Sequence, residues 1–432
     1  MSSPRPTSPQ PPSDARRATP WRALAAALVI AGLAACGPSV SPSPSPTVPP
    51  ATPSPAASVD PQAVYGKVAA QVEQLRDLRP KADVTPVLID EATLRANLTA
   101  EFDRDNPAEL VHANEATLTT LGLLAPGTSL REAYLDLQSG QVIGYYSPDR
   151  DQLFIVSASG GIGPTQRLTY AHEFTHQLQD QNFDLDKLGL DATDQGDRAL
   201  ARLALIEGDA VATQTGWMQA NLTPQELGQV LADASDPVAL AALQRAPAVL
   251  RATALFPYTD GYALVNRLLA EGGLGAVNAA FARPPDSTEQ ILHPDKYLAA
   301  EAPETVGLPK NLASSVGASW RLTATDTLGE LLLRTWLTES GVSPTTAATA
   351  AAGWAGDRLA LVSGPHGEVA VALVTRWDTP VDADEFAHAA GPAIAHVIGT
   401  ARVVSSPGGS SVVVAIAPRE SILADLLRAL GQ

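Results

Sequence analysis

Residues 168–182 read Leu-Thr-Tyr-Ala-His-Glu-Phe-Thr-His-Gln-Leu-Gln-Asp-Gln-Asn and contain the pattern H-E-x-x-H. On a helix, His172 and His176 lie four residues apart on one face, so both imidazoles can bind the same metal ion. Glu173 lies beside them, where its carboxylate can polarise a metal-bound water without being a ligand. The alternative is a helix with two surface histidines and a solvated glutamate. Because the whole chain has only seven histidines, the pattern favours a metal site.

A second amphipathic helix is predicted from Asp197 to Met218, and Glu207 lies within its largely apolar stripe. A carboxylate in apolar surroundings needs a cation. That cation is either a metal ion or a nearby arginine, Arg198 or Arg202. The metal-binding helix just upstream favours the metal. Gly208, next to Glu207, lets another helix pack closely here.

These residues predict a catalytic zinc site. Zinc binds nitrogen and oxygen ligands tetrahedrally, and a catalytic site keeps one position for water. His172, His176 and Glu207 would supply the three protein ligands, and Glu173 would take a proton from the water and pass it to the leaving amine. Asp180, one turn after His176, either orients that imidazole or is simply solvated.

The segment before the metal helix is predicted to be a β-hairpin. Residues 141–147 and 152–157 have strand composition, and Pro148-Asp149-Arg150-Asp151 between them is typical of a turn. An edge strand at this place could pair with an extended peptide and hold it over the metal.

The remaining pattern predicts an α+β fold in two parts. Residues 62–310 are predicted to form a mainly helical domain, and residues 311–432 a C-terminal α+β lobe. The predicted helices before the hairpin cover residues 64–78, 90–98 and 108–124, with a strand at 84–89 and a helix or strand at 130–138. The predicted elements of the lobe are two helices, a hairpin at 358–362 and 369–375, a helix at 382–390, a strand at 412–417 and a final helix.

Residues 1–36 are predicted to be a lipoprotein signal peptide. The apolar run from Ala23 to Ala35 follows three arginines and is too short to span a bilayer comfortably. Leu33-Ala34-Ala35-Cys36 resembles the lipobox of bacterial lipoproteins, which implies a lipid on Cys36; the alternative is a buried structural cysteine. Arg16-Arg17 leaves general and twin-arginine export both open. Residues 37–61 are predicted to be a Pro/Ser-rich disordered linker.

These features predict a protein held outside the cytoplasm by a lipid anchor in the bacterial membrane. Cys36 is the only cysteine, so no disulfide within the chain and no cysteine-based zinc site can form. A net charge of −17 argues against binding to nucleic acid, which needs a basic face.

The pattern His172 to His176, followed by Glu207 in Glu-Gly-Asp-Ala, resembles the gluzincin metallopeptidases, the thermolysin-like group with a downstream glutamate ligand. A longer resemblance is to uncharacterised bacterial lipoproteins of metallopeptidase type. The segments that carry it are residues 140–148, 172–181, 207–210, 256–261, 287–297, 353–358 and 375–378. The resemblance implies a zincin-like domain, bound Zn²⁺ and a peptide or protein substrate.

Enzymes of the gluzincin group also use a histidine or tyrosine to donate a hydrogen bond to the oxyanion. His293 is the first candidate for this catalytic role, with Tyr258, Tyr262 and Tyr297 as others. One departure concerns the third ligand. Thermolysin-like enzymes have an Asn before this Glu and an Asp four residues later, whereas here Ile206 and Val211 occupy those positions.

Two functions are therefore compatible with the sequence. The first is a membrane-anchored, extracytoplasmic zinc metallopeptidase with Glu173 as general base. The alternative is a non-catalytic zinc-binding surface lipoprotein whose C-terminal lobe binds a partner or a cell-wall polymer. An open coordination position and a cleft beside the metal would favour the first.

Overall fold

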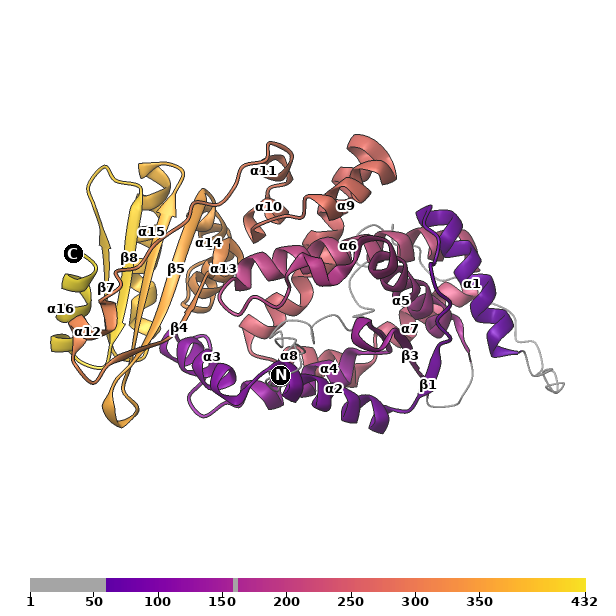
Figure 1. The fold of residues 1–432 in the computed structure, drawn as a ribbon, viewed down its shortest axis with the longest axis horizontal. Coiled ribbons are helices and arrows are strands. Elements are labelled where there is room, and N and C mark those ends of the chain that lie inside the picture. Colours follow the sequence, from indigo (N-terminus) through magenta and orange to yellow (C-terminus); the bar gives the residue numbers. More distant parts are fainter. Residues whose placement is uncertain (1–59, 158–161) are drawn as a thin grey trace, which may run out of the picture.

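The computed structural model describes residues 60–157 and 162–432. The predicted signal peptide with Cys36 and nearly all of the predicted linker lie outside these residues. The described chain is an α+β fold, with a mainly helical part followed by a C-terminal antiparallel sheet (Figure 1). Within these residues, no helix is long and apolar enough to cross a membrane.

The helical part begins with four helices that confirm the predicted pattern. They are α1 (Pro61–Arg76), α2 (Glu91–Asp105), α3 (Ala108–Thr120) and α4 (Leu130–Gln141), the last resolving the choice between helix and strand. The Asp90 side chain accepts a hydrogen bond from the backbone N–H of Thr93, at 2.8 Å, and so caps α2.

The predicted hairpin is present and belongs to a three-stranded sheet. Its strands are β1 (Val87–Ile89), β2 (Gly144–Ser147) and β3 (Gln152–Val156). The order is β1-β3-β2, with β1 parallel and β2 antiparallel to β3. Strand β2 is therefore an edge strand, and it packs against the helix that carries the histidines.

Three long helices form the centre of the helical part. They are α5 (Pro164–Phe183), α6 (Gly196–Asn221) and α9 (Ala248–Ala282), and α6 packs against both of the others (Figure 1). A Cβ atom added at Gly261 of α9 would lie 2.1 Å from the carbonyl oxygen of Ala204, and one added at Gly208 would lie 2.2 Å from that of Gly261. The backbones of α6 and α9 thus touch beside Glu207, as expected for Gly208. Shorter helices, α7 (Pro224–Ala234), α8 (Pro237–Arg245), α10 (Thr288–Leu292) and α11 (Pro294–Leu298), complete this part.

The C-terminal lobe is a five-stranded antiparallel sheet with helices on both faces. The strand order is β4-β5-β6-β8-β7. The strands are β4 (Arg321–Asp326), β5 (Trp354–Ser363), β6 (Val369–Trp377), β7 (Thr400–Ser405) and β8 (Ser411–Ala417). The helices α13 (Gly329–Glu339), α14 (Pro344–Ala351) and α15 (Pro380–Ala393) cover one face, and α12 (Leu312–Val316) and α16 (Glu420–Ala429) cover the other (Figure 1).

Side chains along the central strands of this sheet alternate between two cores. Leu359, Leu361 and Leu373 point towards α13 and α15, whereas Ala360 and Ala372 point towards α16. The predicted hairpin corresponds to β5 and β6. The sequence analysis did not predict β4 and β7, because these two edge strands are half exposed and lack a continuous apolar run.

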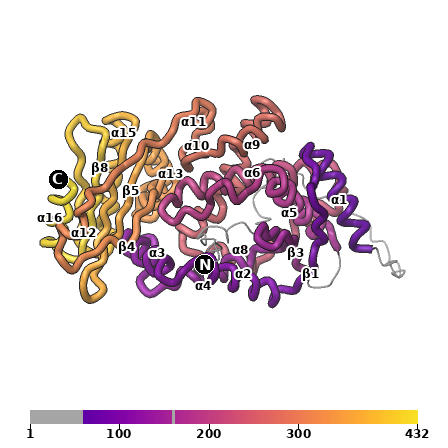
Figure 2. Tube along the Cα trace, in the orientation of Figure 1, coloured from indigo at the N-terminus to yellow at the C-terminus, as the bar shows by residue number. Residues whose placement is uncertain are grey.

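Contacts from the helical part cross the predicted boundary at residue 310. Helix α3, from the first part of the chain, packs against the sheet of the lobe, and Trp336 Nε1 donates a hydrogen bond to the carbonyl of Leu121 at 3.0 Å. The chain trace in Figure 2 shows α3 beside β4. Residues 108–124 thus join the helical part to the lobe.

Candidate metal centre

Helices α5 and α6 bring His172, His176 and Glu207 together, as the sequence predicts. His172 Nε2 lies 3.0 Å from His176 Nε2 and 3.1 Å from Glu207 Oε2, and His176 Nε2 lies 3.4 Å from the same oxygen. All three residues are buried. The second carboxylate oxygen of Glu207 is buried with no hydrogen-bond partner.

This triangle of atoms has the dimensions of a zinc site. For metal–ligand distances near 2.0–2.1 Å, the corners of a tetrahedron lie ~3.3 Å apart. The three observed separations, 3.0, 3.1 and 3.4 Å, are close to this value. Two imidazoles and one carboxylate are also a donor set that zinc binds. The residues present therefore fit a bound metal ion.

The arginine alternative for Glu207 is wrong in this structure. Arg198 and Arg202 both pair with Asp286, at 3.3 and 2.9 Å. Among the described residues, the ion pairs of Glu207 are with the two imidazoles.

Charge and burial act in opposite directions at the three ligand side chains. Burial disfavours the carboxylate of Glu207, but His176 and His172 outweigh it and hold the pKa of Glu207 at about 2. Burial likewise disfavours the cationic form of His176, but Glu207 raises its pKa to about 9. Burial lowers the pKa of His172. The Glu207 carboxylate therefore needs a positive charge beside it, from a protonated histidine or from a metal ion.

Glu173 is fully buried on α5 and is not one of the three grouped ligands. Burial, with a contribution from the negative charge of Glu207, raises the pKa of Glu173 to about 8. A backbone hydrogen bond from Tyr146 offsets part of this rise. A carboxyl group with this raised proton affinity has the character of a general base.

Tyr258 is the oxyanion-donor candidate that lies at the metal centre. Its ring packs on the His172 imidazole, with centroids 6.2 Å apart and an angle of 22° between the planes. Tyr258 is buried on α9, three residues before Gly261. The close contact of α9 with α6 therefore also places this tyrosine.

Gln179, and not Asp180, contacts Nδ1 of His176, the ring nitrogen that does not face His172 and Glu207. His176 Nδ1 lies 2.9 Å from Gln179 Oε1. Asp180 is one residue further round the helix, where it accepts hydrogen bonds from the Tyr146 hydroxyl at 3.1 Å and the Leu185 backbone at 3.2 Å.

His293 lies elsewhere, at the contact with the C-terminal lobe. Its Nε2 lies 3.0 Å from Glu330 Oε1 on α13, and this contact raises the pKa of His293. Neighbouring side chains of the same segment also reach the lobe: Thr288 accepts from the Leu331 backbone at 3.2 Å, and Lys296 contacts Asp378 at 2.6 Å. The segment 287–297 thus joins the two parts of the molecule.

A second group of acidic residues, Glu289, Glu301 and Asp378, is close enough to surround a cation. The ammonium group of Lys296 already occupies the middle of this group, 2.6–2.7 Å from each carboxylate. This cluster is therefore an ion-pair network between the segment 287–301 and the lobe.

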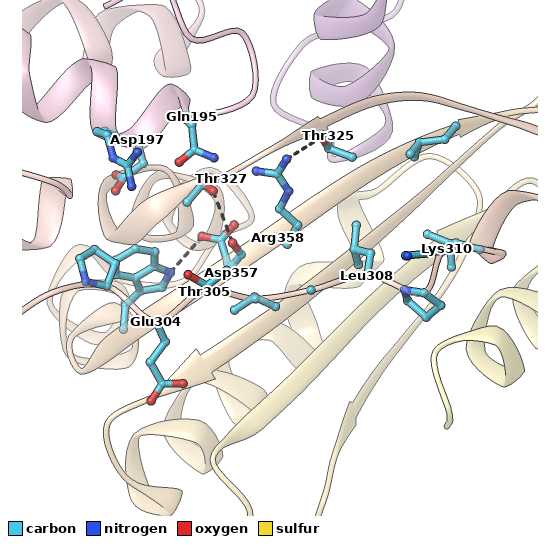
Figure 3. Close-up of a pocket in the computed structure, with 18 of the residues that line it drawn as sticks. Gln195, Asp197, Glu304, Thr305, Leu308, Lys310, Thr325, Thr327, Asp357 and Arg358 are labelled. Carbon is cyan, nitrogen blue, oxygen red and sulfur yellow. Dashed lines mark hydrogen bonds between the residues drawn. The ribbon is translucent and has the colours of Figure 1, made fainter. Parts of the chain in front are cut away.

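Two cavities of different size lie near these features. A small, mainly apolar one of about 80 Å³ opens beside His176 and is walled by β2, α2 and α6. A larger, polar one of about 590 Å³ lies between the start of α6, residues 303–310 and the lobe. Figure 3 shows Gln195 and Asp197 at one end of the larger cavity, Leu308 and Lys310 at the other, and Arg358, hydrogen-bonded to Thr325, between them.

Comparison with known proteins adds little to this geometry. Residues 320–425 match a domain of unknown function, DUF8575. No curated protein matches the chain. A solved structure of a candidate hydrolase with a novel fold, from Chloroflexus aurantiacus, is 18% identical over 56% of this chain and 91% of that one, with a TM-score of 0.35. A likeness this weak supports no inference about activity.

Proposed function

We propose that this protein is a zinc-dependent metallopeptidase. The observation that carries the proposal is the buried triangle of His172, His176 and Glu207, whose edges of 3.0–3.4 Å match three corners of a zinc tetrahedron. The resemblance of the motif to gluzincins agrees with this geometry. The lipobox-like segment ending at Cys36 adds the proposal that the enzyme acts outside the cytoplasm on a lipid anchor.

Each residue of the centre has a proposed role. His172 and His176 bind through Nε2, and Glu207 binds through its carboxylate. When bound, zinc would lower the pKa of a water molecule and polarise the scissile carbonyl. Glu173 then accepts the proton of that water and carries it to the leaving amine. Tyr258, next to His172, is the proposed donor to the developing oxyanion, in place of His293.

The position of β2 agrees with a peptide substrate. This edge strand packs against α5, and its residues Tyr145 and Tyr146 line the small cavity beside His176. A peptide bound along this strand would place a side chain in the apolar cavity beside His176.

Metal analysis and hydrolysis of the purified full chain test the proposal. The wild type should contain about one zinc ion and cleave a fluorescein-labelled casein. Glu173→Gln should keep the zinc and lose hydrolysis, whereas His172→Ala should lose both. His388→Ala, which changes an exposed histidine of α15, should alter neither.

Absence of zinc from the wild type would refute the proposal. Zinc in a wild-type chain that hydrolyses neither casein nor a mixed peptide library would instead favour the non-catalytic lipoprotein.

A further inference from the structure

A line of buried side chains connects the outer nitrogen of His176 to α1, on the far side of α5. Gln179 Nε2 donates to Asp209 Oδ2 at 2.8 Å and to the Ile206 carbonyl at 2.9 Å. Arg76, the last residue of α1, donates through Nε to both oxygens of Asp209, at 2.8 and 3.0 Å. Arg76, Gln179 and Asp209 are each at most 2% exposed.

The chemistry of these contacts allows the Gln179 amide only one orientation. The Ile206 carbonyl and the Asp209 carboxylate can only accept hydrogen bonds, so the atom that faces them both must be the NH₂ group. The amide oxygen must then face His176 Nδ1. Because this oxygen can only accept, Nδ1 carries a proton, and the lone pair of the neutral imidazole is left on Nε2.

Nε2 is the atom that His176 presents to His172 and Glu207. The acceptors around Gln179 therefore determine which nitrogen of His176 is free to bind a metal. We propose that Gln179, held by Asp209 and Arg76, is the positioning residue of this metal centre. This inference rests on the proposed zinc site and extends it to α1, since Arg76 fixes the carboxylate that fixes the amide.

This arrangement also explains the departure at the third ligand. In the thermolysin-like pattern an aspartate stands four residues after the glutamate ligand, where this chain has Val211. Here Asp209 lies two residues after Glu207 and acts through Gln179 on the other helix. The supporting carboxylate is thus present but reaches the zinc ligand indirectly.

The test compares two glutamines of α5. Gln179→Leu removes the three hydrogen bonds of the amide, to His176, Asp209 and the Ile206 carbonyl. Gln181→Leu is the matched control, because Gln181 bonds only to backbone atoms of Lys81 and Ala82. The dissociation constant for zinc is measured for each purified chain by competition with a chelator, together with the visible spectrum of the Co²⁺-loaded protein.

We expect Gln179→Leu to weaken zinc binding by roughly 10- to 100-fold and to change the Co²⁺ spectrum. Gln181→Leu should leave the zinc affinity within about threefold of wild type. Equal affinities and unchanged spectra in the two variants would overturn the proposal. A wild-type chain that binds no zinc would overturn the proposed function as well, so the two failures can be told apart.

A charge-swapped pair separates positioning from general support of the fold. Gln179→Glu alone places a second carboxylate against Asp209, and Asp209→Asn alone leaves the buried Arg76 without its carboxylate. The double variant Gln179→Glu/Asp209→Asn keeps the charge of the network, with the new carboxylate accepting from His176 and from the new amide, but it loses the donor to the Ile206 carbonyl. Its zinc affinity should therefore exceed that of both single variants without reaching the wild-type value, whereas a value at or below that of the better single variant would contradict the role of Gln179.

Discussion

At the residue scale, the ion pair between Arg76 and Asp209 is the most consequential one outside the metal ligands. Their side chains are 1% and 2% exposed. Arg76→Met would leave the Asp209 carboxylate buried without a cation, so we expect the free energy of unfolding to fall by about 3–5 kcal/mol. Denaturant unfolding of the zinc-free chain measures this.

Arg79→Met supplies the comparison for that measurement. Arg79 pairs with Glu73 near the same end of α1, but its side chain is 78% exposed. The change at Arg79 should alter the free energy of unfolding by less than ~0.5 kcal/mol. An equal fall in the free energy of unfolding in the two variants would show that burial does not determine how much the Arg76–Asp209 pair contributes to stability.

A second prediction at this scale concerns Tyr258. If its hydroxyl donates to the oxyanion, Tyr258→Phe should lower kcat by roughly 10²–10³-fold with unchanged zinc content. Tyr262→Phe, one turn further along α9, should keep kcat near that of wild type. A fully active Tyr258→Phe enzyme would rule out the hydroxyl as donor and leave its ring as packing against His172.

The sequence was most informative about single residues with strong chemical constraints. The four-residue spacing of His172 and His176 predicted that they share one helix face. The cost of burying an unpaired carboxylate predicted that Glu207 joins them, and the three residues do form one group. The partner of His176 was not predictable in the same way. Gln179 and Asp180 both follow within one turn, and only the position of Asp209 on another helix decides between them.

At the scale of elements, the crossing of α6 and α9 positions Glu207, the proposed third ligand. Gly261→Ala would place a methyl group 2.1 Å from the Ala204 carbonyl oxygen, so the two helices must move apart. Because Glu207 is three residues from Ala204, we expect a loss of about 2 kcal/mol or more in stability and weaker zinc binding. Thermal unfolding and zinc competition measure the two effects.

Gly275→Ala is the control, on the part of α9 that follows the break in helical backbone at Gly272 and Gly273. A Cβ at Gly275 meets no atom within 4 Å. This change should stabilise the chain by roughly 0.5–1 kcal/mol, because alanine is the better helix former. A destabilised zinc site in the Gly275 variant would show that α9 responds to any substitution, and not to the contact at Gly261.

Elements with a strong local pattern were predictable and their partners were not. The capped helix after Asp90 and the hairpin around Pro148 form where the sequence indicates. Helix α3 was predicted too, but nothing in its periodicity reveals that it packs on the sheet of the C-terminal lobe. The spacing of apolar residues predicts which face of a helix is buried. It does not predict which other element packs against that face.

At the scale of the whole molecule, an aspartate of the lobe joins it to the helical part. Asp326, at the end of β4, accepts from the backbone N–H of Gly196 at the start of α6, at 2.7 Å. Burial raises the pKa of Asp326 to about 7, although its backbone hydrogen bonds act against this. Burial likewise raises the pKa of Asp357, on β5, to about 6.

These raised pKa values predict a stability that falls as pH rises. Between the ordinary aspartate value, about 4, and the folded value, the folded chain binds a proton that the unfolded chain has released. The resulting stabilisation is complete below about pH 4 and is lost as pH rises through about 7 for Asp326. Other carboxylates add their own dependence, so the contribution of Asp326 is isolated by substitution.

Asp326→Asn keeps the accepting oxygen but cannot ionise. Its melting temperature should fall less than that of wild type between about pH 5 and pH 8. Asp136→Asn, at an exposed pair with Arg95, should leave the wild-type pH dependence unchanged. Parallel curves for wild type and Asp326→Asn would mean that Asp326 is ionised throughout this range.

Several of the segments that carry the resemblance form ion pairs between the helical part and the lobe. Lys296, Asp378 and Arg358 come from three of these segments, and their ion pairs hold the helical part against the lobe. Sequence alone presented them as separate motifs, because the pairs link residues 82 and 164 positions apart.

The contact between Gly208 and Gly261 limits how this chain can vary. Where side chains meet, a larger group on one helix can be offset by a smaller one on the other. Here backbone atoms contact backbone atoms, so neither helix has a side chain that could be shortened to make room. We therefore expect Gly261, which is not one of the proposed metal ligands, to tolerate substitution as poorly as the two histidines in a mutational scan.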